Sequence, residues 1–383
     1  LHMSTVTEPV SLDRIENAVD ALLQRVAARV QAELAPQVVD IDVKGQYPEQ
    51  FLRGLGADGL FAAHVPAEMG GTGLGLDALI RGMEETSKVC GSTGFMVWCQ
   101  SALAWYLVNT DNAGLRARLL PAVMRGEVLG GTGLSNLMKS CAGIEDLRLK
   151  AKRVEGGYTV NGVLPWVSNL GADHWFGVGI AVEGMGTMLA AVHGGQAGLN
   201  MVQNAHFVAL EGTRTFACQF RNVFVPDAEV LAHPAEFDGF VKRIKPGFVT
   251  MQCGIALGII DDCVAIMREA DESHAHVNQY LDDQADTLSA ELTAARTAIY
   301  DLGARISAHA PVTPKEVLGL RAAGSELSLK AANAAMLHSG AKGYLIRNPA
   351  QRRVREAIFV AIVTPALKHL RKELAALDAQ AAA

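Results

Sequence analysis

Trp166-Val167-Ser168 is a short run whose residue types could hold a flat conjugated ring. Side chains alternate between the two faces of an extended strand, so Trp166 and Ser168 would project from the same face. The indole could stack on such a ring while the Ser168 hydroxyl forms a hydrogen bond to its edge. The same residues also fit a tryptophan that packs in the core of a β domain. The run alone leaves both interpretations open.

The stretch REAIFVAIVTPALKHL, residues 355–370, contains no acidic residue after Glu356. It has the pattern of an amphipathic helix interrupted by Pro365, and the next acidic residue is Glu373. A carboxylate base must be ionised and within hydrogen-bonding distance of the proton that it takes. Between Glu356 and Glu373 the chain therefore offers no carboxylate for that step.

Metal-binding and disulfide patterns are absent from the sequence. None of the six cysteines forms a Cys-x-x-Cys pair, and most have apolar neighbours, which favours buried reduced thiols over disulfides or a zinc site. His274 and His276 are two residues apart and would point to different faces of a helix. We therefore expect no metal site.

Composition and charge indicate a large globular protein and argue against nucleic-acid or membrane partners. The chain has 383 residues, half of them apolar, which suggests two or three structural units. The net charge of -6 and the pI of about 6.0 give no electrostatic reason to expect a nucleic-acid partner. No apolar run approaches the roughly 18–20 residues that span a bilayer. We expect a cytoplasmic protein without a membrane partner.

Hydrophobic periodicity divides the chain into three parts. Residues 11–135 mostly follow helical spacing, residues 146–230 contain short β-type runs separated by glycine pairs, and helical spacing returns after Pro234. The later part includes an apolar stripe that runs from Leu288 to Ile306. This order predicts domains at residues 4–130, 131–233 and 234–383.

Five segments, in the same order, resemble the acyl-CoA dehydrogenase superfamily. They are LRGLGADGLFAAHVPAEMGGTGLG (52–75), LRARLLPAVMRGE (115–127), YTVNGVLPWVSNLGADHW (158–175), FRNVFVPDAEVL (220–231) and SGAKGY (339–344) followed by Arg355-Glu356-Ala357. The resemblance implies an α+β, mostly α, fold with an N-terminal helical domain, a central antiparallel β-barrel domain and a C-terminal four-helix bundle. It also implies a homo-oligomer, a tetramer or a dimer.

The resemblance implies FAD as the cofactor and suggests which residues bind it. Trp166 would lie beside the isoalloxazine ring, with Val167 next to it in the strand and Ser168 near the ring atom N5. In GTGLSN (131–136), Ser135 matches the family's hydroxyl residue, and Leu134 would offer backbone groups to the pyrimidine edge of the ring.

Several family features at the far end of the cofactor are replaced. Ser273 stands where an arginine usually meets the flavin diphosphate of a neighbouring subunit, and Leu337 replaces a glutamine. Thr364-Pro365 stands where the family has Gly-Thr, and proline removes a backbone donor. These losses suggest a more weakly or differently held flavin, either FMN or a reduced flavin that binds during turnover.

The catalytic base of the family also has no counterpart. Its usual glutamate aligns with Val363, and the alternative site used by some members falls near Phe248 or Val249. A valine cannot accept a proton, so the catalytic residues are unknown from sequence. Gln100 and His338 remain as polar candidates for a catalytic role.

Three functions are consistent with this sequence. The first is a flavin-dependent oxidoreductase that acts on an acyl-CoA or related thioester without the usual glutamate and passes electrons to an electron-transfer flavoprotein. The second is a monooxygenase of the same fold, supplied with reduced flavin by a separate reductase, because members of that branch also lack the glutamate and some have a proline near this place. The third is a non-catalytic flavin- or acyl-binding protein.

Overall fold

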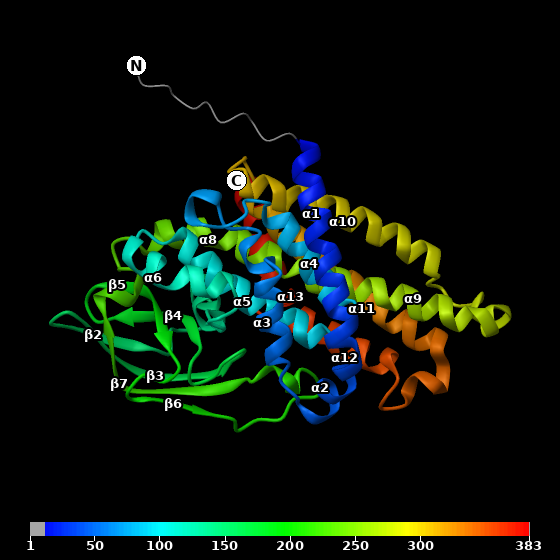
Figure 1. Cartoon of the computed structure of the whole chain (residues 1–383), viewed down its shortest axis with the longest axis horizontal. Helices are drawn as coiled ribbons and strands as arrows, with labels where there is room; N and C mark the ends of the chain where they lie inside the picture. Colours follow the sequence, from blue (N-terminus) through cyan, green and yellow to red (C-terminus); the bar gives the residue numbers. More distant parts are fainter. Residues whose placement is uncertain (1–11, 383) are drawn as a thin grey trace, which may run out of the picture.

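The computed structural model describes residues 12–382, with helices over most of the molecule and a sheet at one end (Figure 1). The helices before the sheet match the ranges that periodicity predicts, and the short η elements between them complete the connections. They are α1 (Leu12–Arg29), α2 (Val38–Lys44), α3 (Glu49–Ala57), α4 (Leu76–Ser87), α5 (Gly91–Asn109) and α6 (Ala113–Met124). Helix α5 is buried from Gly91 to Leu107, as expected for a helix that is apolar all round.

The middle of the chain forms one eight-stranded sheet. Its strands are β1 (Gly130–Gly133), β2 (Lys150–Val154), β3 (Gly157–Val167), β4 (Trp175–Val182), β5 (Gly186–His193), β6 (Leu199–Val202), β7 (Phe216–Pro226) and β8 (Val230–Ala232). The order is β6-β7-β3-β2-β4-β5-β8, with β1 paired to β4. The expectation of a closed antiparallel barrel needs correction, because this path does not close on itself and both β1 and β2 pair parallel with β4.

Residues 135–141 form the short helix α7 (Ser135–Cys141), which hydrophobic periodicity did not predict. LMKS, residues 137–140, makes up more than half of this helix. Helix α7 and the β2–β3 hairpin separate β1 from β4, and such a long crossover is what parallel pairing needs. Residues 137–140 are thus accommodated in a helical turn between the sheet and the helices that follow it.

The C-terminal part is helical, as predicted. It contains α8 (Phe237–Met251), α9 (Cys253–Asn278), α10 (Ala285–Ser307), α11 (Pro314–Ser339), α12 (Pro349–Ile362) and α13 (Leu367–Ala382). Helix α9 packs along α11, and α10 and α12 also contact both. The proposed domain boundary at 233/234 falls between β8 and α8, whereas the one at 130/131 falls one residue inside β1. Residues 4–11 of the first proposed domain lie outside the described residues.

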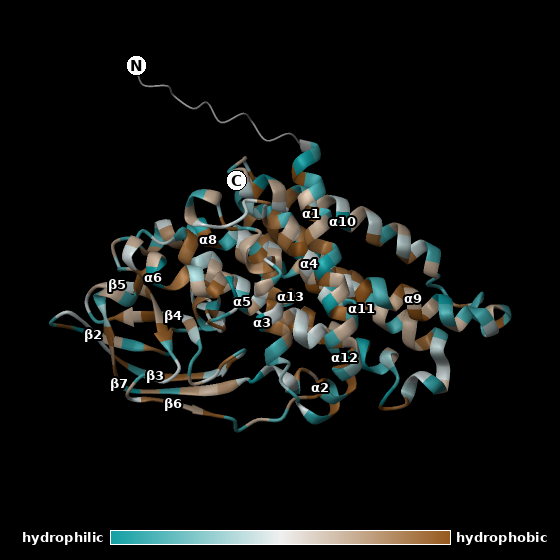
Figure 2. Ribbon diagram, in the orientation of Figure 1, coloured by the Kyte–Doolittle hydropathy of each residue, from teal (hydrophilic) through white to brown (hydrophobic). Residues whose placement is uncertain are grey.

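Helices α8 and α9 run almost continuously and are more apolar than the sequence pattern suggested (Figure 2). Within residues 12–382, Phe237–Asn278 is the one helical stretch long and apolar enough to cross a membrane, and 83% of its apolar window is buried inside the protein. From the sequence we expected no apolar run of membrane-spanning length, and this stretch contains Pro246 and the Asp261-Asp262 pair. The helix continues past both, and its burial identifies it as a core helix of this fold.

Candidate functional site

The site predicted from the sequence lies where the end of β1 meets the end of α12. Ser135 and Thr364 are 229 residues apart in sequence, yet their hydroxyl oxygens are 2.7 Å apart. Leu134, one residue before Ser135, is fully buried, and both of its backbone groups already have partners. Its N–H donates to the Thr132 hydroxyl at 3.3 Å, and its carbonyl accepts from the Met138 N–H at 2.9 Å. If the Leu134 backbone bound a cofactor, its N–H and carbonyl would therefore have to share these existing hydrogen bonds.

Behind Thr364 lies a buried polar relay that the sequence analysis missed. The Gln252 amide donates to the Thr364 carbonyl at 2.9 Å, and its oxygen accepts from Arg321 Nε at 2.8 Å. Arg321 also donates to the Val360 carbonyl at 2.7 Å and to the Ser325 hydroxyl. The one available sequence signal was that Arg321 continues an apolar helical stripe that includes Val317.

Arg321 is a buried cation without a carboxylate partner among the described residues. Burial lowers the pKa of its guanidinium to about 10. Buried charges are usually paired, because a charge loses much of its solvation free energy when it leaves water. An unpaired cation close to the ends of α12 and β1 gives this region a positive electrostatic potential that favours a nearby anion.

Trp166, Val167 and Ser168 lie at the end of β3 and point in different directions. Trp166 is 61% exposed, so the interpretation of this residue as part of the β-domain core is wrong. Val167 is buried in the hydrophobic core of the sheet. The Ser168 hydroxyl lies 2.7 Å from the hydroxyl of Thr215, the residue directly before β7. The strand therefore presents an accessible aromatic surface next to a partly buried hydroxyl.

Val363 follows α12 directly and is half-buried against the hydrophobic core. The alternative base positions, Phe248 and Val249, are buried apolar residues of α8. Within residues 12–382 no carboxylate forms a hydrogen bond with Ser135 or Thr364. Glu145, which follows α7, is held by the Asn136 amide at 2.8 Å. Among residues 12–382, therefore, no carboxylate is hydrogen-bonded at the junction of Ser135 and Thr364, and the assignment of Val363 to the base position stays a prediction.

Three acidic residues of α9 and α12 are engaged in ion pairs. Glu356 accepts from the Gly91 N–H at 3.0 Å and pairs with Arg353 at 2.7 Å. Asp262 also pairs with Arg353, at 2.6 Å, while Asp261 pairs with Lys88 at 3.2 Å and with Arg296 at 3.1 Å. These carboxylates hold helices together through their ion pairs with arginine and lysine.

Gln100 and His338, the two polar candidates, make structural contacts. The Gln100 amide donates to the carbonyls of Val123 and Val128, at 3.1 and 2.9 Å, and its oxygen accepts from the Gly130 N–H at 2.7 Å. Gln100 thereby fixes the segment that leads into β1. The imidazole of His338 lies 3.0 Å from the Asp271 carboxylate and 2.9 Å from the Asp283 carbonyl. Every side-chain nitrogen and oxygen of both residues is occupied.

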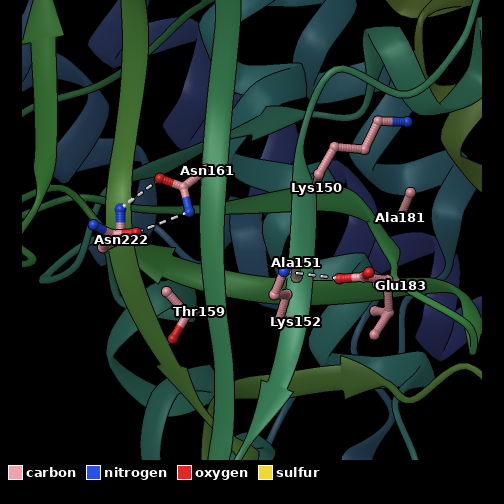
Figure 3. Close-up of a pocket in the computed structure, with 9 residues that line it drawn as sticks. Lys150, Ala151, Lys152, Thr159, Asn161, Ala181, Glu183 and Asn222 are labelled. Atoms are coloured by element: carbon pink, nitrogen blue, oxygen red, sulfur yellow. Dashed lines mark hydrogen bonds and ion pairs between the residues drawn. The ribbon is translucent and has the colours of Figure 1, made fainter.

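A separate groove of about 620 Å³ lies on the outer surface of the sheet (Figure 3). Four of its polar side chains form two pairs: Lys152 contacts Glu183 at 3.3 Å, and the Asn161 amide donates to Asn222 at 3.0 Å. None of the predicted site residues lines this groove. No group of three or more metal-ligating side chains occurs among residues 12–382.

The residues at the ends of β1, β3 and α12 are compatible with a flavin. An exposed indole offers a stacking surface, and the Ser135 and Ser168 hydroxyls offer hydrogen bonds. At the two altered positions, the Ser273 hydroxyl lies 2.7 Å from Nδ1 of its neighbour His274, and Leu337 is 63% exposed. The expectation of a more weakly or differently held flavin stays a prediction.

Two family models match the chain on either side of the sheet. The acyl-CoA dehydrogenase N-terminal domain matches residues 17–127, and the acyl-CoA dehydrogenase C-terminal domain matches residues 247–363. The first covers α1–α6 and the second covers the helices from the end of α8 to Val363.

Curated relatives and solved structures agree with these matches. The chain is 22% identical to the probable acyl-CoA dehydrogenase FadE25 of Mycobacterium tuberculosis (strain ATCC 25618 / H37Rv), over 88% of this chain and 89% of that protein. It is 24% identical to the mitochondrial isovaleryl-CoA dehydrogenase of Oryza sativa subsp. japonica, over 85% of this chain and 83% of that protein.

The fold is shared with solved structures that differ in their chemistry. The glutaryl-coenzyme A dehydrogenase in complex with glutaryl-CoA superposes with a TM-score of 0.84 at 19% identity, covering 97% of this chain and 96% of that one. The prolyl acyl carrier protein oxidase AnaB superposes with a TM-score of 0.76 at 15% identity, covering 94% and 98%. The fold predicted from the sequence is thus confirmed, and the chain belongs to the acyl-CoA dehydrogenase family of FAD-dependent flavoprotein oxidoreductases.

Proposed function

We propose that this protein uses reduced flavin and molecular oxygen to oxygenate a small organic substrate, with a separate flavin reductase as its partner. The observation that carries the proposal is Val363, an apolar residue at the position of the family's base, with the nearby carboxylates committed to ion pairs. Removal of an α-proton from an acyl thioester needs an ionised base within reach. Oxygenation by reduced flavin does not need that base.

The chain's own residues have separate roles in this proposal. Trp166 stacks against the flavin ring, and Ser168 and Ser135 bind its polar edge. When bound, reduced flavin activates oxygen for transfer to the substrate. The apolar surroundings of Val363 and Phe248 keep bulk water away from the reacting atoms. Arg321 supplies a positive potential that stabilises negative charge in the site.

A second candidate is oxidation of an acyl thioester, carried on coenzyme A or on a carrier protein. The relatives that align over more than four-fifths of this chain are named acyl-CoA dehydrogenases, and the neighbour AnaB is named as an acyl carrier protein oxidase. This candidate takes an electron-transfer flavoprotein or oxygen as the electron acceptor. It requires a base other than the side chain at position 363.

An exposed apolar surface on the helical part supports a homo-oligomer, a dimer or a tetramer. Its large residues come from the ends of α9 and α11, the 344–346 segment and α12: Val277, Tyr280, Leu337, Tyr344, Leu345, Ile346, Ile358 and Ile362. Contiguous exposed apolar residues usually mark an interface. Light scattering on the purified protein measures the number of subunits and so tests the proposed homo-oligomer. The cytoplasmic location predicted from the sequence stays a prediction.

Absorbance spectra of the purified protein separate the candidate functions. We expect the protein to bind reduced FAD or FMN under anaerobic conditions and to yield a transient absorbing oxygen adduct when oxygenated buffer is mixed in. Isovaleryl-CoA and glutaryl-CoA should leave an oxidised flavin spectrum unchanged. Bleaching of bound oxidised flavin by either thioester would favour the second candidate. Failure to bind flavin in both oxidation states would contradict both and leave a non-catalytic acyl-binding protein.

Substitution at position 363 tests the identification of the missing base. If Val363 occupies the base position, Val363→Glu should introduce acyl-CoA oxidation that the parent protein lacks, and Val363→Gln, of similar size, should not. Equal activity in both variants would show that residue 363 does not face the reacting carbon.

A further inference from the structure

Ser168 begins a chain of hydroxyl groups that crosses from β3 to the loop before β7. Its oxygen lies 2.7 Å from Thr215 Oγ1, which lies 2.8 Å from Thr213 Oγ1. Thr213 in turn donates to the Leu210 carbonyl at 2.6 Å. Thr213 is fully buried, while Ser168 and Thr215 are half-buried at the end nearer the exposed Trp166.

The direction of every hydrogen bond in this chain is fixed by its last member. A carbonyl oxygen can only accept, so Thr213 must use its single hydroxyl hydrogen on Leu210. Thr215 must then donate to Thr213, and Ser168 must donate to Thr215, because each hydroxyl has one hydrogen. No other arrangement satisfies all three contacts. Ser168 is left with lone pairs only and is an acceptor toward anything that binds beside it.

The loop that carries Thr213 and Thr215 is held rigidly. The Asn169 N–H donates to the Thr213 carbonyl at 2.8 Å, and the Leu170 N–H donates to the Arg214 carbonyl at 3.3 Å. Leu210 and Arg214, which bracket Thr213, have φ angles of 65° and 45°, in the left-handed region that non-glycine residues rarely adopt. Such strain persists only where the surrounding structure imposes it, and it clusters at functional sites.

We propose that Thr213 and Thr215 are positioning residues that make Ser168 a hydrogen-bond acceptor, so that the site prefers reduced over oxidised flavin. The inference rests on the proposed function, which places the flavin ring beside Ser168. The oxidised ring has a bare N5 atom that can only accept a hydrogen bond, and Ser168 has no hydrogen to give it. The reduced ring has N5–H, which can donate to Ser168.

Paired variants of Thr213 test this inference. Thr213→Val keeps the shape of the side chain and removes its hydroxyl, so Thr215 can donate to Ser168 and Ser168 can donate to the oxidised ring. We expect the ratio of the dissociation constants of oxidised and reduced FAD to fall about tenfold, the effect of one net hydrogen bond. For a two-electron couple this equals a fall of about 30 mV in the potential of the bound flavin. Thr213→Ser should restore the parent ratio.

The sign of the potential shift follows from linkage between binding and reduction. A protein that binds the reduced form more tightly raises the potential of the bound flavin above that of free flavin. Loss of this preference in Thr213→Val therefore lowers the potential of the bound flavin by about 30 mV relative to the parent protein. Anaerobic titration with FAD and FMN in both states measures the same ratio independently.

Two further tests distinguish an effect through Ser168 from a general disturbance of the structure by Thr213→Val. Thr215→Val breaks the chain one step closer to Ser168 and should shift the ratio in the same direction. In a Ser168→Ala background, which removes the acceptor, Thr213→Val should leave the ratio unchanged. Equal weakening of both flavin states by Thr213→Val, or the same ratio change with and without Ser168, would overturn the inference while leaving the proposed function intact. Failure of the parent protein to bind either state would overturn both.

Discussion

The two ends of α12 are held by opposite kinds of polar contact. Near its start, Arg353 pairs with Asp262 at 2.6 Å and with Glu356 at 2.7 Å, and Glu356 accepts from the first N–H of α5 at 3.0 Å. Just past its end, Thr364 is held by neutral groups, Ser135 and Gln252, and Gln252 in turn accepts a hydrogen bond from the charged Arg321. Both arginines are fully buried, but only Arg353 has carboxylates around it.

The pKa values of the two arginines show what this difference means. Burial alone would lower the pKa of Arg353, but Asp262 and Glu356 more than reverse that effect and raise it. Burial lowers the pKa of Arg321 to about 10 with little to oppose it. The start of α12 is therefore neutralised internally and anchors the fold. Its end retains a net positive potential, which suits a region that receives an anionic cofactor or intermediate.

Removal of Glu356 should break the anchored end and give the largest effect. Glu356→Ala leaves Arg353 with one carboxylate and the Gly91 N–H without its acceptor, so we expect a loss of about 3–5 kcal/mol in the free energy of unfolding. Urea unfolding followed by circular dichroism measures it. Glu326→Ala, which removes a surface pair with Arg371, is the matched control and should cost about 0–1 kcal/mol. Similar losses in the two variants would contradict the anchoring role.

A matched pair of arginine variants compares the two ends directly. Arg353→Met leaves Asp262 and Glu356 buried without a cation, whereas Arg321→Met leaves no carboxylate unpaired. Methionine fills much of the arginine volume in both cases. We expect Arg321→Met to be the more stable variant by about 2 kcal/mol or more, because an uncompensated buried charge is the dominant cost. Equal destabilisation would mean that Arg321 has a countercharge in the folded protein.

Charged contacts occur again in α13, the helix that follows the neutral end of α12. Burial raises the pKa of Glu373, but hydrogen bonds from His369 and Lys245, each at 2.6 Å, outweigh it and hold the pKa at about 2, below the ordinary 4.5. A depressed pKa contributes stability above pH 4.5 that is lost as the pH falls toward 2. Glu373→Gln should therefore flatten the dependence of stability on pH between 4.5 and 2. An unchanged slope would rule out Glu373 as its source.

Much of the fold could be predicted from the sequence because its signals are local. Helical stripes, glycine pairs and the five family-like segments gave the correct order of helices and strands. The open edge of the sheet and its parallel pairs could not be predicted, because they depend on which distant strands become neighbours. Helix α7 was missed since its seven residues contain too little periodicity to distinguish a helix from a loop.

The candidate site was predicted less completely than the fold. The sequence indicated Trp166, Ser168 and the absence of a carboxylate at Val363, but it gave no reason to connect Thr213 or Arg321 with them. Gln100 and His338 attracted attention because they are polar, and the structure shows each fully engaged in a structural contact. Residue type alone cannot distinguish a polar group that binds substrate from one that satisfies buried backbone groups.

The hydroxyl pair of Ser135 and Thr364 offers the smallest and most specific test of the neutral end. Because both groups are uncharged, their mutual bond at 2.7 Å should contribute only about 0.5–1.5 kcal/mol to stability. Ser135→Ala and Thr364→Val should therefore each have a modest effect, and the double variant should lose less than the sum of the two. Thr364→Ser, which keeps the hydroxyl, is the control. Strict additivity would show that the two hydroxyls do not act as a pair, and the end of α12 would then be held to β1 by packing alone.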